Sequence, residues 1–372
     1  MASNTSIPSN IGVTQIPFVY NNLTGDTRID QVCAYIGTHN KSCVYTGFSF
    51  FEITGVEGAG LGNFSAILGL APDDPNNGPS FISALKDNNL ISRKMLGLQL
   101  NRGNLVSIAT YGGVTPSLML KNSSGIAPVY YYQTTDTKRW KVWVADFINQ
   151  NSSGAYISVG NKNSSYIARV DTFYQAVLLP NDIYPHFVTL INNYVNMTEG
   201  AGKGQLFCPS GPKDGFCYVN NSTCAQVYSK FSTFYVKMAD KKAFKITKDS
   251  YLQDGVSTNG TNYCTVLIQR NNQPGMTNEY LLGLPFLYDY YLVINFDNNT
   301  IGFNGDMIDL TPVDPSPVDP NPPPPPAPPG PEPENPSESK SSFPWWIIIV
   351  ILVVLFVIGA AVIFIRMRNK RL

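Results

Sequence analysis

The feature that most constrains this chain is a stretch of 21 residues without a charged side chain near its C-terminal end, Trp345 to Ile365. At ~1.5 Å per residue, a helix of that length crosses the ~30 Å hydrocarbon core of a bilayer. A buried core helix would normally be shorter and would carry a polar face. We therefore predict a transmembrane helix over residues 345–365, with Trp345 and Trp346 at the membrane interface.

The short segment after this stretch is basic, because residues 366–372 contain Arg366, Arg368, Lys370 and Arg371 and no acidic residue. Under the positive-inside rule this tail is cytosolic. Everything before Trp345 then lies outside the cell or in the lumen of the secretory or vacuolar system, as in a single-pass type I membrane protein. Translocation usually needs a signal peptide, and Met1 to Ser6 lacks an apolar core, so we expect further sequence upstream.

Cysteines and glycosylation acceptors agree with that topology. The six cysteines are Cys33, Cys43, Cys208, Cys217, Cys224 and Cys264, as expected for disulfides in an oxidising compartment. The sequence-local pairing is Cys33–Cys43, Cys208–Cys217 and Cys224–Cys264, although six cysteines allow 15 arrangements. The N-x-S/T acceptors for N-linked glycans all precede residue 311 and are Asn4, Asn22, Asn40, Asn63, Asn122, Asn151, Asn163, Asn196, Asn220, Asn221, Asn259 and Asn298.

Composition separates a stalk from a folded region. Residues 311–343 hold half of the chain's 28 prolines and few apolar side chains, which is typical of an extended polyproline II segment. Residues 1–310 instead contain short runs rich in Val, Ile, Tyr and Phe, such as 46–54, 140–147 and 234–238. Their period-2 alternation predicts strands. Helical periodicity is limited to about 80–88 and 181–192, the second with a capping residue in Pro180 to Asp182. We expect a mainly β domain.

Several classes of site are disfavoured by the same composition. The formal net charge is zero and basic residues form no stripe, so we expect no nucleic-acid partner. The two histidines, His39 and His186, have no metal-ligand spacing, and we expect neither a metal nor a cofactor. The glycine cluster 58–62 lacks the following Lys and the strand-to-helix context of a phosphate loop, so a plain loop is the better interpretation.

Three segments together resemble the pepsin-like aspartic protease family (peptidase A1). Residues 63–72, which contain Ile67-Leu-Gly-Leu70, are similar to the segment after the flap of that family, together with 79–85 and 90–95. Residues 290–303 are similar to its closing hairpin, and Cys224 with Cys264 to its second-lobe disulfide loop. Tyr280 to Phe286 weakly echoes 64–72, as in a duplicated lobe. The resemblance implies a bilobal fold with the first lobe truncated. The predicted C-terminal transmembrane helix is an addition to that fold.

In that family, one D-T-G-(S/T) loop from each lobe brings two carboxylates together over one water, so that one holds a proton while the other deprotonates the water. The resemblance maps the second loop onto Asp171, the catalytic candidate, and Thr172, its supporting residue. Phe173 stands in place of the glycine and Tyr174 in place of the Ser/Thr that orients the carboxylate. Because glycine serves where backbone must approach closely, we expect Phe173 to crowd the floor of the cleft.

The first loop has no counterpart. The family's flap maps onto Phe18 and Gly25, so Phe18 replaces the flap tyrosine and the first catalytic loop would lie before Met1. Asp26-Thr27-Arg28 is a substitute that we disfavour, because it leaves no room for the strands and the flap before Ile67. An ordinary loop aspartate in a diverged fold remains an alternative for Asp171.

We therefore expect a partial N-terminal lobe (1–130), a C-terminal lobe (131–310), the stalk (311–343), the transmembrane helix (345–365) and the tail (366–372). The resemblance implies a membrane-anchored aspartic-type endopeptidase that acts on polypeptides, with this chain inactive for want of the first aspartate. The alternative is a pseudoprotease that binds a protein ligand at a surface, and a third hypothesis is a purely structural glycoprotein.

Overall fold

The structure, a computed structural model, describes residues 7–8, 15–18, 21–36, 40–57, 68–73, 79–103, 106–151, 153–160, 165–195, 206–208 and 216–310. In the first four ranges it describes the backbone and, of the side chains, that of Arg28. Residues 1–312 belong to one compact unit. The predicted segments 311–343, 345–365 and 366–372 lie outside the described residues, and within the described ranges no helix is long and apolar enough to span a membrane.

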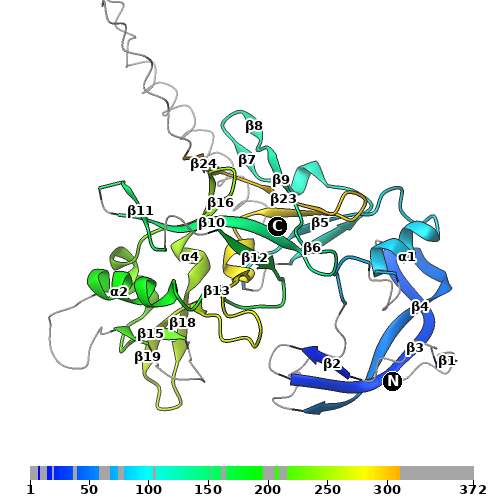
Figure 1. Cartoon of the computed structure of the whole chain (residues 1–372), viewed down its shortest axis with the longest axis horizontal. Coiled ribbons are helices and arrows are strands. Elements are labelled where there is room, and N and C mark those ends of the chain that lie inside the picture. Colours follow the sequence, from blue (N-terminus) through cyan, green and yellow to red (C-terminus); the bar gives the residue numbers. More distant parts are fainter. Residues whose placement is uncertain are drawn as a thin grey trace, which may run out of the picture. The chain divides into compact units, whose positions relative to one another are not determined.

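The largest sheet has nine strands and carries the second half of the chain (Figure 1). Its order is β20 (Ile268–Arg270), β13 (Val177–Leu179), β21 (Tyr280–Leu282), β12 (Tyr166–Val170), β10 (Lys141–Gln150), β16 (Phe234–Met238), β17 (Lys242–Ile246) and β24 (Met307–Asp309), with β11 (Tyr156–Ser158) on β10. The pairs β12–β21 and β13–β20 are parallel, whereas β10 pairs antiparallel with each of its neighbours.

Alternation along β10 explains how this sheet buries one face. Val142 and Val144 are fully buried, whereas Trp143 between them is 47% exposed. A β-bulge between Val144 and Asp146 then shifts the register against β16, so that Phe147 and Ile148 are both buried. The predicted strands at 140–147 and 234–238 are thereby confirmed as β10 and β16.

A second sheet joins the two predicted lobes. Its five strands, in order, are β6 (Ile108–Tyr111), β5 (Met95–Gln99), β22 (Tyr291–Asn295), β23 (Thr300–Asn304) and β9 (Val129–Gln133), all antiparallel. Strands from near residue 100 therefore pair directly with strands from near residue 300. The predicted closing hairpin at 290–303 forms as β22 and β23, and it lies in the middle of this sheet.

Disulfides tie a smaller four-stranded sheet together. Its order is β14 (Leu206–Phe207), β15 (Cys217–Asn220), β19 (Asn262–Val266) and β18 (Leu252–Val256). Cys208 is bonded to Cys217 and Cys224 to Cys264, so two of the sequence-local pairs are confirmed. Between β15 and β18 the chain also forms α3 (Cys224–Val227), the 3-10 helix η2 (Tyr228–Lys230) and α4 (Lys248–Tyr251).

The N-terminal sheet is dominated by a long antiparallel hairpin of β3 (Asn21–Ile36) and β4 (Asn40–Glu57), with β1 (Ile7–Pro8) and β2 (Gln15–Phe18) on β3. The predicted strand at 46–54 lies within β4.

Asp26 and Thr27 lie inside β3, opposite Glu52 and Phe51, so this tripeptide is not a catalytic loop. The register sets Cys33 opposite Cys43. Phe18 ends β2 opposite Asn21, and the glycine cluster 58–62 lies outside the described residues.

The two predicted helices are confirmed with one correction. Ser80 caps α1 (Phe81–Asp87) by accepting from the N–H of Ser83. The second, α2 (Tyr184–Val195), begins later than expected, after a turn in which the N–H groups of Ile183 and Tyr184 both donate to the carbonyl of Pro180. Asp182, expected near the cap, instead accepts a 2.6 Å bond from the Tyr166 hydroxyl. His186 is exposed on α2.

The remaining elements are short. They are η1 (Pro116–Leu118), β7 (Lys121–Asn122), β8 (Gly125–Ile126) and α5 (Leu284–Leu287). The main hydrophobic core is continuous from α1 and β5 through the nine-stranded sheet, and aromatic rings fill much of it. Phe147 and Phe234 stack with ring centroids 5.3 Å apart, and Phe187 of α2 packs on both. Such burial is the main favourable term in folding.

Candidate active site

Asp171 is the first residue after β12, at the point where that strand runs parallel to β21. Its backbone N–H donates to the carbonyl of Leu282 at 3.2 Å, and the N–H of Leu284 donates to the carbonyl of Tyr174 at 2.8 Å. These two bonds hold the loop 171–174 against the end of β21. Gly283 lies where the chain leaving β21 passes against this loop, and a Cβ there would collide with the carbonyl oxygens of Tyr174 and Ala176. The glycine of the Leu281-Leu-Gly283 echo is therefore required by close approach of backbone.

The carboxylate of Asp171 has two partners. Arg169 Nη2 donates to Oδ2 at 2.9 Å, and the backbone N–H of Phe173 donates to Oδ1 at 3.0 Å. The side chain is 27% exposed. Strand alternation explains the ion pair, since residues 169 and 171 lie on one face. Each carboxylate oxygen is thus already engaged by a donor from the same short segment, and one of these donors carries a full charge.

Arg169 is itself held from several sides. Its side chain is 14% exposed, its Nη1 lies 3.2 Å from the sulfur of Met276, and its guanidinium lies 5.7 Å from the centre of the Tyr174 ring. Arg139 Nη1 reaches the same sulfur at 3.5 Å. Within the described part of the chain, the buried Nε of Arg169 has no hydrogen-bond acceptor. This guanidinium is therefore fixed by packing as well as by its bond to Asp171.

Tyr174, not Phe173, is the aromatic ring that is buried beside Asp171. Tyr174 is 8% exposed and packs with Ala176, Leu178 and Leu281, and its hydroxyl accepts a bond from the side chain of Gln273. Phe173 remains partly exposed, as does Thr172. The expectation that Phe173 crowds the floor of the cleft stays a prediction, and the buried aromatic side chain of this loop is that of Tyr174.

Sequence reasoning found Asp171 and missed its partners. Arg169 could have been found, because an arginine two residues before an aspartate on a strand shares its face. Met276 and Gln273 had no local signal, since they come from the loop before β21, about 100 residues further along the chain. That loop is anchored by the buried Asn271, whose side-chain amide donates to the carbonyls of Met276 (2.7 Å) and Glu279 (2.8 Å).

The structure brings no second carboxylate to Asp171 through any contact that it describes. Phe18, the predicted flap residue, is described by its backbone alone.

Six of the predicted glycosylation acceptors lie at turns or strand ends: Asn122, Asn151, Asn220, Asn221, Asn259 and Asn298. Two lie in β3 and β4, Asn22 and Asn40, and four lie outside the described residues, Asn4, Asn63, Asn163 and Asn196. Across the described ranges no group of three or more His, Cys, Asp or Glu could hold a metal ion.

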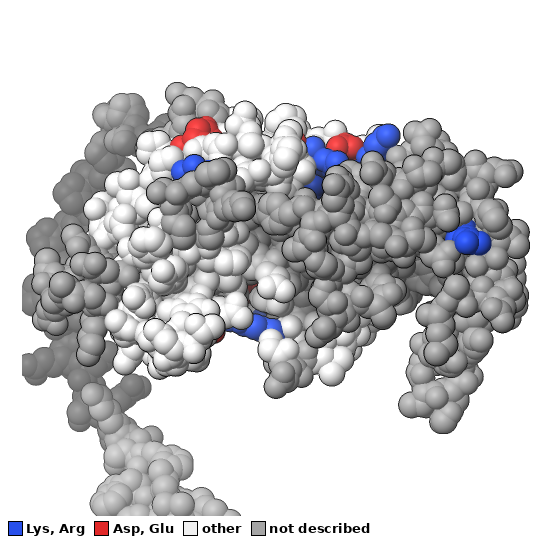
Figure 2. Space-filling view, turned by 90° about the horizontal axis from the view of Figure 1, so that it is seen from below, with Lys and Arg blue, Asp and Glu red and all other residues white. Residues whose placement is uncertain are grey.

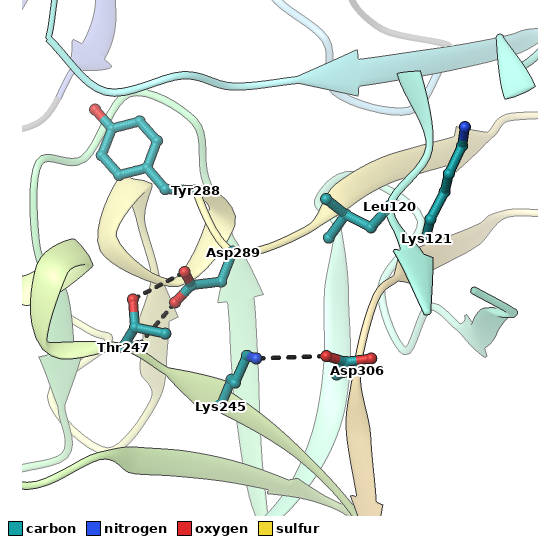
Figure 3. Close-up of a pocket in the computed structure, with 7 residues that line it drawn as sticks. All are labelled: Leu120, Lys121, Lys245, Thr247, Tyr288, Asp289 and Asp306. Carbon is teal, nitrogen blue, oxygen red and sulfur yellow. Dashed lines mark hydrogen bonds and ion pairs between the residues drawn. The ribbon is translucent and has the colours of Figure 1, made fainter. Parts of the chain in front are cut away.

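A pocket of about 290 Å³ lies elsewhere in the molecule, lined by Leu120, Lys121, Lys245, Thr247, Tyr288, Asp289 and Asp306 (Figure 3). Asp289 accepts bonds from the backbone N–H of Thr247 (2.8 Å) and from the hydroxyls of Thr247 and Ser250 (both 2.9 Å). Burial raises the pKa of its carboxyl, against these hydrogen bonds and the charge of Lys245. Both carboxylate oxygens of Asp289 accept hydrogen bonds that fix the start of α4. We therefore interpret this pocket as a structural contact rather than a catalytic site.

Charge is mixed rather than segregated on the surface. Lys141, which lies directly opposite Arg169 on β10, pairs with Glu279 at 2.8 Å and lies 3.6 Å from Asp136. On the face shown in Figure 2, basic and acidic side chains of the described residues occur in small groups and form no continuous patch of one sign. Nothing on that face favours a polyanionic partner.

Known proteins with similar sequences and folds are aspartic peptidases. The family model described as "Eukaryotic aspartyl protease" matches residues 21–305. The "Probable aspartic-type endopeptidase CTSD" of Trichophyton verrucosum is 26% identical over 269 residues, and that of Arthroderma benhamiae is 25% identical. Both alignments cover 71% of this chain and 46% of the relative, so the chain spans about half the length of these curated relatives.

The fold itself has a solved counterpart. The crystal structure of an aspartic proteinase from Irpex lacteus superposes with a TM-score of 0.59 at 15% sequence identity, covering 82% of this chain and 84% of that one. At such identity the likeness concerns the fold. The mainly β, bilobal architecture expected from the resemblance is confirmed, whereas the roles of individual residues rest on the geometry around Asp171.

Proposed function

The chain belongs to the eukaryotic aspartyl protease family, and on that premise we propose that its folded part binds polypeptides without hydrolysing them. The observation that carries this proposal is the bond from Arg169 to Oδ2 of Asp171. Hydrolysis by an aspartic pair needs a carboxylate that is free to share a proton with its partner and to take one from water. The bond from the fixed guanidinium occupies one acceptor position of Oδ2 and ties its orientation to Arg169, which opposes both tasks.

Two substitutions beside Asp171 support the same proposal. The resemblance assigns a glycine to position 173 and a hydroxyl-bearing orienting residue to position 174, and this chain has Phe173 and Tyr174. Tyr174 directs its hydroxyl to Gln273 and presents its ring to Arg169. The side chains of this loop thus contact Arg169, whereas the side chains of a catalytic loop would orient the aspartate. These 372 residues also contain no D-T-G sequence.

We further propose that the domain is displayed outside the cytosol, with residues 345–365 as a transmembrane anchor and 311–343 as the stalk. The support is the uncharged 21-residue stretch, the four basic residues after it and the six cysteines before it. Two disulfides among the described residues, Cys208–Cys217 and Cys224–Cys264, are in keeping with an oxidising compartment. Fractionation of epitope-tagged full chain, with alkaline extraction, tests the anchor: recovery in the supernatant would refute it.

The activity test uses the purified full chain in detergent, incubated at acidic pH with a degenerate library of quenched fluorogenic peptides. We expect no cleavage above background from the chain or from its Phe173→Gly variant, because Oδ2 of Asp171 stays bonded to Arg169 in both. Cleavage that is lost in Asp171→Asn but kept in Asp87→Asn, an exposed aspartate at the end of α1, would overturn the proposal. Peptides retained without cleavage, measured by fluorescence anisotropy, would support binding.

The second candidate is an active endopeptidase whose other carboxylate comes from outside these 372 residues. It is favoured by one observation, that the chain spans 46% of the curated relatives. The two candidates separate when the coding region is extended upstream and the longer protein is assayed with and without Phe173→Gly. Activity in the longer protein that requires Asp171 establishes the endopeptidase; a longer protein that binds peptide and leaves it intact establishes the binding protein.

A further inference from the structure

Three of the predicted glycosylation acceptors share one local geometry that Asn220, Asn221 and Asn298 lack. In each, the side-chain Oδ1 of the asparagine accepts the backbone N–H of the hydroxyl residue two positions on. The pairs are Asn122 with Ser124 (2.9 Å), Asn151 with Ser153 (3.1 Å) and Asn259 with Thr261 (3.1 Å). This is an Asx turn, in which the asparagine side chain imitates the backbone of a tight turn.

Each of the three turns closes a β-hairpin and contains a glycine at positive φ. Asn122 and Asn151 both begin the tetrapeptide Asn-Ser-Ser-Gly, with Gly125 at φ 122° and Gly154 at φ 84°, and Gly260 after Asn259 has φ 80°. The hairpins are β7–β8, β10–β11 and β18–β19. Because the turn is set by residues within a few positions, the geometry is available to each segment locally, before the rest of the domain packs.

The Asx turn has a defined effect on the asparagine amide. The carbonyl oxygen is turned inward, and Asn151 Oδ1 also accepts from the Ser153 hydroxyl at 2.7 Å and the Ala155 N–H at 2.8 Å. Among the residues that the structure describes, the amide nitrogens of these three asparagines donate to no protein acceptor. Asn122 and Asn259 are exposed, and Asn151 is half-buried. The nitrogen that a glycan would occupy is thus presented to solvent, and bonds to the oxygen polarise the amide.

Asn220, Asn221 and Asn298 lack this arrangement. Thr300, two residues after Asn298, already belongs to β23 opposite Asn295. Thr223, two residues after Asn221, caps α3 in a capping box with Gln226. Ser222, two residues after Asn220, is 8% exposed, and Oδ1 of Asn220 accepts from the next residue. In these three cases the hydroxyl residue serves a strand, a helix cap or the core.

We propose that Asn122, Asn151 and Asn259 are the preferred N-glycosylation sites among these acceptors, a proposal that rests on the luminal location proposed above. The donor is an oligosaccharide linked to a lipid through a diphosphate. The amide Nδ2 attacks the anomeric carbon of the first sugar, forming an N–C bond, while the bond from that carbon to the diphosphate oxygen breaks. The lipid diphosphate leaves with the electron pair, and one Nδ2 proton passes to a base of the transferase.

The test separates the sites from the location. The full chain is expressed with an appended signal sequence in a eukaryotic secretory host, so that translocation is imposed. Glycans are removed enzymatically in ¹⁸O-labelled water, which marks each formerly glycosylated asparagine as labelled aspartate, and site occupancy is read by peptide mass spectrometry. Ser124→Ala, Ser153→Ala and Thr261→Ala serve as acceptor-loss variants, and Asn298 is the matched exposed acceptor within the same molecule.

We expect occupancy at the three Asx-turn sites to exceed that at Asn298 and Asn221 by several-fold, and each hydroxyl-loss variant to lose occupancy at its own site alone. Equal or higher occupancy at Asn298 would overturn the proposal, as would three empty sites in translocated protein whose Asn298 is modified. The location is tested separately, in the protein extended upstream along its coding region and carrying no appended signal: glycosylation at none of its acceptors would contradict the luminal location and leave the ranking measured with the appended signal in place.

Discussion

Gly283 lies where the chain leaving β21 passes against the backbone of the Asp171 loop. A Cβ at this position would collide with the carbonyl oxygens of Tyr174 and Ala176 and lie 3.0 Å from the Tyr174 Cβ. Since two of these contacts are backbone atoms, they cannot move aside as a side chain could. We expect Gly283→Ala to lower the free energy of unfolding by about 1–3 kcal/mol, the usual cost of overpacking. Urea denaturation followed by tryptophan fluorescence measures it.

The matched control for that substitution is Gly113→Ala, because a Cβ at Gly113 meets no described atom within 4 Å. An unchanged midpoint for Gly113→Ala beside a lowered one for Gly283→Ala attributes the loss to the crossing. If both variants unfold at the wild-type midpoint, the loop 171–174 is able to move away from β21, and the fixed position of Asp171 argued above is wrong.

The residues at the site also mark how far sequence reasoning reached. Asp171 was proposed as the candidate because Asp171 and Thr172 match the first two residues of the family's second D-T-G-(S/T) loop. Arg169 is a close neighbour of Asp171 in the sequence, but no sequence pattern predicted that its guanidinium would form an ion pair with the Asp171 carboxylate. Met276 and Gln273 fix Arg169 and Tyr174 from a loop about 100 residues away, and contacts across such a separation are determined by packing that no local pattern encodes.

At the scale of elements, the start of α1 shows how one carboxylate organises a helix. Asp73 accepts the N–H of Ser80 at 2.7 Å and the hydroxyl of Ser83 at 2.6 Å, and lies 3.7 Å from Lys94. Burial alone would raise the pKa of Asp73, but the hydrogen bonds from Ser83 and Ser80 together with Lys94 outweigh it, and the pKa is lowered from 3.8. The carboxylate therefore contributes stability above pH 3.8, and this is lost as the pH falls through the folded-state value.

We expect Asp73→Asn to lower the free energy of unfolding by about 1 kcal/mol at neutral pH, the usual worth of such hydrogen bonds. The difference from wild type should shrink in acid below pH 3.8, because protonated Asp73 has lost the same charge. Denaturant melts at both pH values measure it, with the exposed Asp87→Asn as control. A difference that is constant with pH would contradict the role of the carboxylate charge.

Elements were predictable in proportion to how local their signals are. The strand β10 and the helix α1 follow from alternation and from helical periodicity, both contained in about ten residues. The start of α2 was misplaced because Asp182, a good capping residue by type, is used by Tyr166 instead. The order in which β21 lies between β12 and β13 has no signature in any one strand, since each of the three is a short run of apolar residues.

At the scale of the whole molecule, the architecture was reached through family resemblance rather than through periodicity. Patterning indicated a mainly β domain, but it could not show that β5, near residue 97, pairs with β22, near residue 293. The resemblance located the closing hairpin at 290–303 and implied two lobes, whereas the pairing of that hairpin with β5 is seen only in the structure. A continuous core then follows, from Phe81 and Ile82 of α1 to Phe303 of β23.

The carboxyls of Asp146, which is buried, and of Asp289, which is half-buried, make the stability of the domain depend on pH. Asp146 is 7% exposed, and burial raises its pKa above 3.8 against the bonds from Ser158, Phe147 and Gly160 and the charge of Lys237. Burial likewise raises the pKa of Asp289. A raised value in the folded state means that the folded protein binds protons more readily than the unfolded chain, which titrates near 3.8. Stability therefore increases as the pH falls from neutrality through the folded-state values, and levels off below 3.8.

We expect the urea midpoint of the full chain to rise as the pH is lowered from neutrality toward 3.8, the unfolded-state value, because the folded protein binds these protons more readily than the unfolded chain. Asp146→Asn and Asp289→Asn remove the titrating groups, so the pH dependence should weaken in each and be least in the double variant, whatever their absolute stability. Asp87→Asn, which is exposed, should keep the wild-type slope. A wild-type midpoint that falls on acidification, or a slope that survives in the double variant, would show that these two carboxyls do not set the response of the fold to acid.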